Sequence, residues 1–532
     1  MHTVEITLEQ VLLARDRRVL RQRELAARYG GTLLSFTMNI AGPVKDAPLV
    51  RLAFQAGLAA LDRDLGKPVH RELIQASTGP EALLVYDRPA PWVKERCLLL
   101  EEREAVGRLY DLDVLSPEGE KLSRPQSRRC LICGGPVTVC SRSRAHGLPA
   151  IRARTRDILA DFAAGHLSAL ARQALEDEVD LTPKPGLVDR RNTGAHDDMD
   201  RPLFHRSAGA LAPYFRQFAA RGMAGASPRE LQSLGREAEH AMLAATGGVN
   251  THKGALYSFA LLLSALGRCL AEGGDPFDTA AAIAAALPPA ENTHGSAVRA
   301  QCGGVRQEAV SGFPTARHMR GLLESAGPLS ALVWAMSRLD DSTLVYRDGP
   351  QGLAYVRRRA AELLRLPEEA LPPALEALDD DLMARRLSPG GSADLLALAL
   401  FLRPPEIALV HLADLPPVVN GPAAPAAHPL DEARQPFAVI GGHHLVIQVL
   451  DGPGVVAFGL LLRQLVQLRD ELLHLLPRQQ GAHQHPGVHR GHHLAGSVQR
   501  RKGIVQPGLV HSRQRRRPNA LHPADALAAI DH

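Results

Sequence analysis

The stretch from Thr182 to Asp200, TPKPGLVDRRNTGAHDDMD, limits the fold of this chain more than any other. Pro183 and Pro185 cannot occupy a helix interior and Gly186 follows at once, so the stretch begins as a shaped loop. Lys184 within that loop is a compact cation suited to phosphate. Dense oxygen ligands attract Mg²⁺, which usually enters a site together with substrate phosphates. The stretch predicts a nucleoside polyphosphate site, and a solvated acidic surface loop is the alternative. The candidate Mg²⁺ ligands are Asp189, Asp197 and Asp198, and His196 lies in the same run of sequence as a candidate catalytic residue.

Length and composition bound the class of protein. A chain of 532 residues is expected to form roughly two to four domains. The net charge of +5 is small for this length and does not require a nucleic-acid partner. The amino terminus lacks the apolar core of a signal peptide, and no apolar run reaches the ~18 residues of a membrane span. Six cysteines over this length do not form a disulfide framework. We therefore expect a cytoplasmic protein without a membrane segment.

The first domain, residues 1–152, combines helix and strand patterns. Apolar residues at three-to-four-residue spacing predict a helix over Leu8–Tyr29. A β-rich run and a Gly-Pro turn follow, and Lys45 comes directly after them. Strands are predicted at Ala82–Tyr86, Val93–Glu101 and Leu109–Leu115, separated by turn signals. The pattern is that of an α+β domain.

Asp111 and Asp113 lie two residues apart in the last of these strands, so they face the same side of the sheet. Two carboxylates on one face can hold a divalent metal against a triphosphate, an arrangement similar to that of nucleotidyltransferases. Arg108 in the preceding turn could pair with phosphate oxygens. The alternative is an exposed polar strand face.

Cys130, Cys133, Cys140 and His146 follow within RRCLICGGPVTVCSRSRAHG. This spacing could close a tetrahedral Zn²⁺ site like that of a zinc knuckle. The alternative is a reduced thiol cluster without metal. Arginines around the cluster, Arg128 among them, form a basic patch fit for a phosphate-rich ligand.

Four motifs of this domain occur in the same order as in a known enzyme family. They are SFTMNIAGPVK, TGPEALL, GRLYDLDV and RRCLICGGPVTVCSRSRAH. They resemble apo-citrate lyase phosphoribosyl-dephospho-CoA transferase over almost all of residues 1–150. The resemblance implies attachment of a CoA-derived group to a serine of the citrate lyase acyl carrier (gamma) subunit, with release of pyrophosphate. It agrees with a metal role for Asp111 and Asp113, and Lys45 is a candidate phosphate ligand.

The second domain, residues 155–401, reads as all-α, after a short linker at Arg152–Arg156. Polar, glycine-rich loops separate its helices, among them TGGVNTHKGAL, GVRQEAVSGFP, DDSTLVYRDG and SPGGSADLLA. A helix start beside a lysine is typical of a phosphate site, and Ser392 is expected to cap the last helix with Asp394 in its first turn. Capped loops without function are the alternative. The candidate substrate and phosphate ligands are Lys184, Asn250, His252, Lys253, His294, Arg306, Glu308 and Arg347.

These loops, in this order with TPKPGLVD and NTGAHDDM, resemble triphosphoribosyl-dephospho-CoA synthase over about 250 residues. The resemblance implies that ATP and 3'-dephospho-CoA are joined with release of adenine, and that His196 or a carboxylate such as Asp197 takes the attacking hydroxyl's proton. Asp348 follows Arg347 where the family pattern has glycine. That departure puts the local loop geometry in question, since Asp tolerates positive φ less well.

The tail, residues 402–532, differs in composition from both domains. It holds thirteen of the chain's 23 histidines, and its strongest basic run is at residues 513–517. We interpret it as disordered, or as sequence that is not a selected domain. A metal-binding His-rich extension and a nucleic-acid arm are the alternatives.

Together the two domains predict a bifunctional transferase, because the product of the second would be the substrate of the first. The equivalent machinery of malonate decarboxylase is one rival, and the citrate-type motifs of the first domain oppose it. A zinc-knuckle nucleic-acid-binding protein is the other. The modest charge and the scarcity of stacking aromatics make nucleic acid an unexpected partner.

Overall fold

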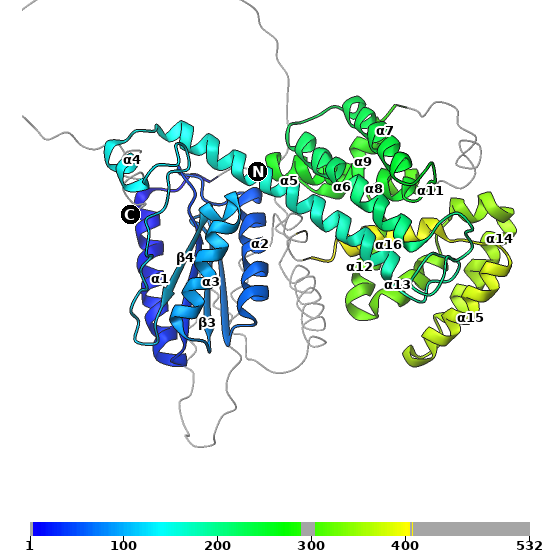
Figure 1. The fold of residues 1–532 in the computed structure, drawn as a ribbon, viewed down its shortest axis with the longest axis horizontal. Coiled ribbons are helices and arrows are strands. Elements are labelled where there is room, and N and C mark those ends of the chain that lie inside the picture. The colour runs from blue at the N-terminus through cyan, green and yellow to red at the C-terminus, as the bar shows by residue number, and fades with distance from the viewer. Residues whose placement is uncertain (1–3, 289–303, 405–406, 408–532) are drawn as a thin grey trace, which may run out of the picture. The chain divides into compact units, whose positions relative to one another are not determined.

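The computed structural model describes residues 4–288, 304–404 and 407 (Figure 1). His294 and almost all of the predicted tail lie outside the described residues. The predicted disorder of that tail therefore stays a prediction. The described chain contains an α+β domain at its amino end and a helical domain after it, as the sequence predicts.

The first domain is built on a four-stranded antiparallel sheet in the order β2-β3-β1-β4. Its leading helix α1 begins with a capping box, in which Thr7 and Gln10 satisfy each other's backbone N–H groups. Gly30 ends α1 in the left-handed conformation, as the Gly-Gly signal predicts. The elements are α1 (Leu8–Tyr29), β1 (Thr32–Met38), α2 (Pro48–Leu65), β2 (His70–Ala76), β3 (Gly79–Tyr86), α3 (Ala90–Arg103), η1 (Ala105–Leu109), β4 (Tyr110–Leu115) and α4 (Val137–Ser143).

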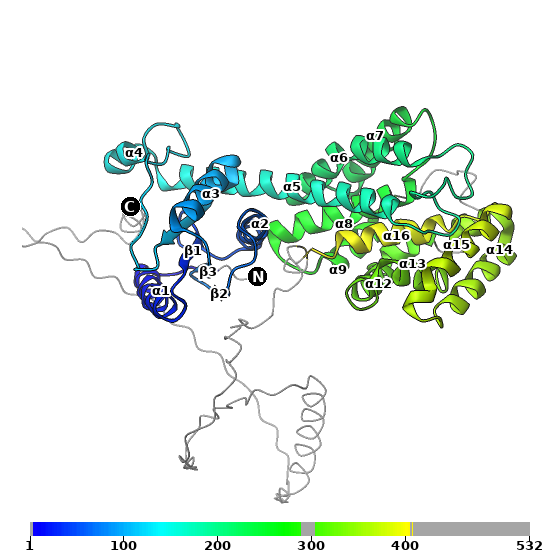
Figure 2. The same ribbon diagram turned by 60° about the horizontal axis from the view of Figure 1, so that its bottom comes forward.

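The two faces of this sheet are covered by different helices, as Figure 2 shows for α1 on one side and α2 and α3 on the other. Leu25 of α1 packs with Leu33 and Leu83, whereas Phe36 and Leu112 point into the larger core under α2 and α3. Residues opposite one another on paired strands share a face. The α1 face of the sheet is therefore the one that carries the polar residues of β4.

One predicted strand of this domain is wrong, because residues 93–101 belong to helix α3. The side chains that α3 buries include Val93, Cys97 and Leu100, which recur at helical spacing. The short apolar run could not by itself distinguish a buried strand from one buried stripe of a helix. The linker predicted at Arg152–Arg156 is likewise helical, since it lies within α5.

The second domain is made of helices around one apolar core, among them α8, which is packed by α6, α7, α9 and α16. In the described part of the chain α8 is the single helix that is long and apolar enough to cross a membrane. The most apolar stretch of this helix is 72% buried inside the protein. The helices are α5 (Leu148–Asp180), α6 (Arg201–Met223), α7 (Pro228–Ala245), α8 (Lys253–Glu272), α9 (Pro276–Ala286), α11 (Gly304–Val310), α12 (Pro314–Ser325), α13 (Gly327–Met336), α14 (Ser342–Leu363), η2 (Glu368–Ala370), α15 (Leu371–Ala384) and α16 (Gly390–Phe401).

Candidate active sites of the two domains

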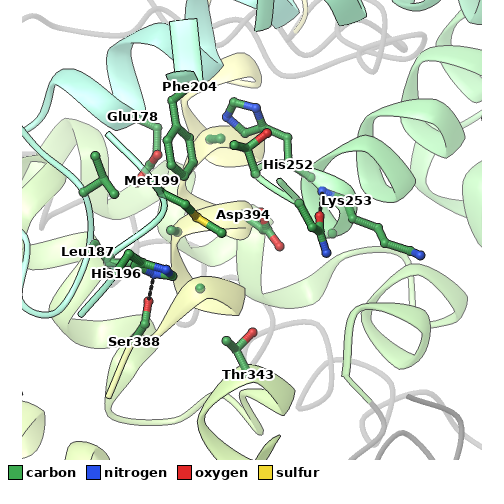
Figure 3. A pocket seen from close by; sticks show the side chains of 18 of the residues that line it. Glu178, Leu187, His196, Met199, Phe204, His252, Lys253, Thr343, Ser388 and Asp394 are labelled. Atoms are coloured by element: carbon green, nitrogen blue, oxygen red, sulfur yellow. Dashed lines mark hydrogen bonds between the residues drawn. The ribbon is translucent and has the colours of Figure 1, made fainter. Parts of the chain in front are cut away.

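A cavity of about 460 Å³ lies in the helical domain, where the loop of residues 181–200 meets the amino ends of α8, α14 and α16 (Figure 3). Each helix start carries unpaired backbone N–H groups and a partial positive charge. Three such ends around one cavity favour a polyphosphate there. The polar residues that line the cavity include Glu178, Lys184, His196, Asn250, Thr251, His252, Lys253, Ser342, Thr343, Arg347, Ser388 and Asp394.

Asp189 organises the loop of residues 181–200 from within. One carboxylate oxygen accepts from the Lys184 amide at 2.9 Å and the Thr182 hydroxyl at 2.7 Å, and the other accepts from the amides of Arg191 at 2.6 Å and Asn192 at 3.1 Å. Both oxygens are therefore occupied by protein donors. The structure gives this carboxylate a loop-shaping position, and Asp189 does not line the cavity as a free ligand would.

Asp379 of α15 fixes the same loop from outside. Its fully buried carboxylate accepts from the Gly186 amide at 2.8 Å, the Asn192 side chain at 2.7 Å and Arg191 at 2.8 Å. A Cβ at Gly186 would collide with the backbone of Leu387, which explains the glycine of the TPKPG sequence. The partner Asp379 could not be found from sequence, because it lies far along the chain.

Lys184 is 1% exposed, and its amine is paired with Glu178 of α5 at 2.5 Å. Burial raises the pKa of Glu178, and the lysine charge opposes that shift. A buried charge is tolerated only when it is paired. The structure brings Lys184 to the cavity, as the sequence predicts, but its amine is engaged by a carboxylate that sequence analysis missed.

Asp394 of α16 lies at the centre of the residues drawn in Figure 3 and faces the start of α8. Burial, followed by the negative charges of Asp341 and Glu178, raises the pKa of Asp394 well above its usual value, while a hydrogen bond from the Ala255 amide opposes the shift. A Cβ at Gly254 would collide with the Asp394 carboxylate, so the glycine of the THKG sequence keeps this space open. A carboxyl group with a raised pKa in a cavity is suited to proton transfer.

Asp341 joins two of the three helix starts. The sequence did not reveal its partners. Its buried carboxylate accepts from the amides of Thr343 in α14 and Ser392 in α16, both at 3.0 Å. The expectation that Ser392 caps α16 is wrong, because α16 begins at Gly390 and Ser392 is already inside it. The cap comes from a distant loop, which local sequence could not reveal.

His252 is buried at the start of α8, with Nδ1 hydrogen-bonded to the Ser207 hydroxyl at 2.8 Å. Thr251 donates to that hydroxyl at 2.7 Å. Burial, helped by Lys184 and His205, lowers the pKa of His252 to about 3. Nε2 has no hydrogen-bond partner among the described residues. His252 is therefore a neutral imidazole in the cavity wall, with one ring nitrogen unpaired among the described residues.

His196 is held at the opposite side of the cavity, with Nε2 3.0 Å from the Ser388 hydroxyl and Nδ1 3.1 Å from Arg347 (Figure 3). Burial and Arg347 lower the pKa of His196. The predicted loop of residues 340–349 is helical from Ser342, with a kink at Asp348 and Gly349. Asp348 has φ −144°, which any residue adopts, and the positive φ falls on Gly349. The departure from glycine at 348 is therefore harmless.

Other predicted residues of this domain lie away from the cavity or have other partners. Asp197 is 92% exposed and Asp198 is also exposed, and neither lines the cavity. Lys253 and Asn250 line it, but the Lys253 amine is paired with Glu239 at 2.5 Å. Glu308 accepts from the amide and hydroxyl of Thr315 at the start of α12, and Arg306 is exposed on α11. Neither of these two lines the cavity.

In the first domain Asp111 and Asp113 share the α1 face of the sheet, opposite Thr37 and Ser35 of β1. Asp113 is paired with Lys121 at 2.7 Å, and Arg128 lies 3.4 Å from Asp111. Burial and the neighbouring Asp113 raise the pKa of Asp111, and Arg128 opposes that shift. The predicted common orientation of the two carboxylates is confirmed.

Arg108 and Lys45 each bind a backbone carbonyl. Arg108 donates to the backbone carbonyl of Arg129, and Lys45 donates to the carbonyl of Ile40. The cations at the pair are instead Lys121 and Arg128, and sequence analysis placed Arg128 in a general basic patch. The Arg128 guanidinium also donates a hydrogen bond to Glu101 at 2.7 Å.

The four predicted zinc ligands do come together in the structure. Their ligand atoms all lie within 4.8 Å of one another.

Two family profiles match consecutive parts of the chain. Residues 6–162 match CitX, apo-citrate lyase phosphoribosyl-dephospho-CoA transferase, and residues 164–409 match CitG, ATP:dephospho-CoA triphosphoribosyl transferase. Protein CitXG of Haemophilus influenzae is 34% identical over 449 residues, which cover 75% of this chain and 96% of that protein. The chain belongs to the CitXG family.

Relatives of the second domain alone support the same division. The probable 2-(5''-triphosphoribosyl)-3'-dephosphocoenzyme-A synthase of Pseudomonas putida is 41% identical over 263 residues, 45% of this chain and 94% of that protein. A probable synthase of the same name from Albidiferax ferrireducens is 40% identical over 270 residues, 44% of this chain and 89% of that protein. This CitXG-family chain is thus a bifunctional transferase of citrate lyase prosthetic-group biosynthesis, with its CitX domain first and its CitG domain second.

Proposed function

We propose that the cavity of the CitG domain joins ATP to 3'-dephospho-CoA with release of adenine, and that the acidic pair of the CitX domain transfers the product to the citrate lyase acyl carrier subunit with release of diphosphate. The observation that carries the first half is Asp394, a carboxylate of raised pKa placed among three helix starts. The zinc-knuckle nucleic-acid-binding alternative has no comparable support.

In the CitG cavity the partial positive charge at the helix starts attracts the triphosphate of ATP, although protein carboxylates already accept from the amides of Thr343, Ser392 and Ala255. The ribose hydroxyl of dephospho-CoA attacks the anomeric carbon of ATP, and the bond from that carbon to adenine breaks. Asp394 takes the proton of the attacking hydroxyl, since a carboxylate whose pKa is raised is a stronger base once it is ionised. The unpaired Nε2 of the neutral His252 ring is available for a hydrogen bond with the departing base.

In the CitX domain the serine hydroxyl of the carrier attacks the α-phosphate of the triphosphoribosyl group, and diphosphate leaves. Arg128 and Lys121 lie beside the acidic pair and can bind phosphate oxygens. Both of these phosphate-binding cations lie on the segment that follows β4. A nucleotidyltransferase-like mechanism on this sheet is part of the proposal.

Mg²⁺ fits the CitX pair better than the CitG loop. Asp111 and Asp113 offer hard oxygen ligands on one face of β4, and their side chains are reached by solvent. In the CitG loop the oxygens of Asp189 are filled by protein donors. We propose that Asp111 and Asp113 hold the ion, which would neutralise charge on the leaving diphosphate.

The test incubates the full chain with ATP and dephospho-CoA and measures adenine by chromatography. Asp394→Asn keeps the shape of the side chain and removes the base, so adenine release should fall by about 10²–10⁴-fold. Glu362→Gln, an exposed carboxylate of α14, is the matched control and should be unchanged. Adenine release by Asp394→Asn at the parent rate would remove Asp394 from the reaction.

A further inference from the structure

The segment between β4 and α5 is ordered without a core of its own. None of residues 115–154, all of which the structure describes, is buried. Short α4, within this segment, also buries no side chain. Leu122 and Leu131 are only partly buried against the core of the sheet domain, so the hydrophobic effect contributes little here. Small units of this kind usually depend on a disulfide or a metal.

Four ligand atoms converge at the middle of this segment. The Sγ atoms of Cys130, Cys133 and Cys140 and a ring nitrogen of His146 all lie within 4.8 Å of one another. Ligands around a tetrahedral Zn²⁺ with Zn–S bonds of ~2.3 Å are themselves roughly 3.8 Å apart, so this grouping has the size of a metal site. The Nε2 of His146 is buried and has no hydrogen-bond partner among the described residues. A polar nitrogen in that position requires a partner.

The backbone around the cluster has the shape that metal-binding turns need. The Cys130 amide donates to the Gly135 carbonyl at 2.7 Å, and the Ile132 amide points at the Cys130 sulfur at 3.4 Å. Gly134 takes the positive φ that closes this turn. Cys140 comes from α4, and the three cysteines are free thiols. The turn thus presents two sulfurs to a third on a short helix.

We propose that these four residues bind one structural Zn²⁺, which fastens the segment between β4 and α5, residues 116–147. Three thiolates and an imidazole complete a closed tetrahedral set, so the ion would have no open position for chemistry. This assignment rests on the cluster alone and does not depend on either enzymatic activity.

The same segment carries Arg128, directly before the cluster. Arg128 contacts Glu101 at 2.7 Å and Asp111 at 3.4 Å, and the adjacent carbonyl of Arg129 accepts from Arg108. The Val137 amide donates to the Arg128 carbonyl at 3.1 Å, which ties this arginine to the cysteine turn. The ion therefore positions Arg128 at the acidic pair, a consequence that rests on the proposed transfer function.

The test uses the full chain, produced without a histidine tag, and must discount the many histidines of the tail. Total zinc is measured by mass spectrometry after dialysis against a weak chelator, and Co²⁺ is then exchanged into the protein. Cobalt bound by thiolates gives a charge-transfer band that histidines alone do not give. The expected result is that band in the parent, its loss in Cys133→Ser with about one equivalent less zinc, and no change in Cys269→Ser.

Each other outcome overturns the assignment. No thiolate band in the parent, equal zinc in the parent and Cys133→Ser, or a disulfide between Cys133 and Cys140 found by peptide mass spectrometry would exclude the site. The parent spectrum decides the question even if Cys133→Ser fails to fold.

Carrier loading and adenine release are then measured on zinc-depleted protein. Loss of loading with adenine release retained supports the positioning of Arg128, and unchanged loading refutes it. Absence of loading in the zinc-replete parent would refute the proposed function and leave the metal site intact.

Discussion

The buried pair of Lys184 and Glu178 supports the sharpest prediction about the helical domain. With the amine and carboxylate 2.5 Å apart, their attraction is about 6–7 kcal/mol at an effective dielectric of ~20, and desolvation of the two ions offsets much of it. The net value of the pair is therefore small. Removing one partner is different, because it leaves the other charge buried without compensation.

Lys184→Met keeps the length of the side chain and removes its charge, so it should destabilise the domain by ~3–5 kcal/mol. Changing both residues to Met should recover most of this loss. The sequence alone suggests that Lys184→Ala would leave the fold intact, and the 1% exposure of Lys184 reverses that expectation. Arg172→Met, on the surface pair with Glu176 of the same helix, is the control and should cost under about 1 kcal/mol.

The chain has two tryptophans, one in each domain, which allows the helical domain to be followed alone. In a Trp92→Phe background, urea unfolding is monitored by the fluorescence of Trp334, which stacks on His318 in the helical domain. Adenine release is measured on the same samples below the unfolding transition.

The Lys184→Met loss should also shrink as the pH falls. Burial already holds the pKa of Glu178 above its usual value, and without the lysine the folded protein binds a proton there that the unfolded chain does not hold. Stability of Lys184→Met should therefore rise as pH decreases towards the unfolded pKa. A loss below about 1 kcal/mol, or a double variant as unstable as the single one, would refute the buried-charge argument.

Four further predictions concern the two sites and the tail. Adenine release should rise with pH through the raised pKa of Asp394, because the base must be ionised. If the residual activity of Asp394→Asn shows the same dependence on pH as the parent, Asp394 is not the titrating base. Gly254→Ala should abolish adenine release by displacing that carboxylate, while loading of the carrier from supplied precursor continues, and full activity would show that the cavity tolerates a methyl group. Asp113→Asn should reduce carrier loading by orders of magnitude, seen by mass spectrometry of the carrier, with adenine release untouched. A chain that ends after residue 409 should keep both activities, since buried Ile407 is retained, and insolubility would show that the tail is needed for folding.

Much of the fold followed from local patterns. The helix at Leu8–Tyr29, the strand of Asp111 and Asp113 and the helical second domain were all predictable, because their signals lie within one element. The strand predicted at Val93–Glu101 failed because a short apolar run fits a buried strand and a buried helix stripe equally well. Only the packing of the domain distinguishes those two.

The candidate sites divide in the same way. Lys184, His196, His252 and the cysteine cluster were recognisable because their residue types and spacing indicate chemistry without any partner. Their states were not predictable, since pairing and burial are properties of the folded chain. The structure engages the Lys184 amine with Glu178 and turns Arg108 away from the acidic pair.

By itself the sequence determined the order of the two domains, their families and most of the residue types around each site. Tertiary structure alone decided that Asp394 lies in the cavity beside the Lys184–Glu178 pair, that Asp341 caps a helix from a distant loop, and that Arg128 reaches Asp111. The physical reason is that charge, proton affinity and capping depend on neighbours in space. Those neighbours come from segments far apart in the chain, and burial among them sets the free energy of each ionised group.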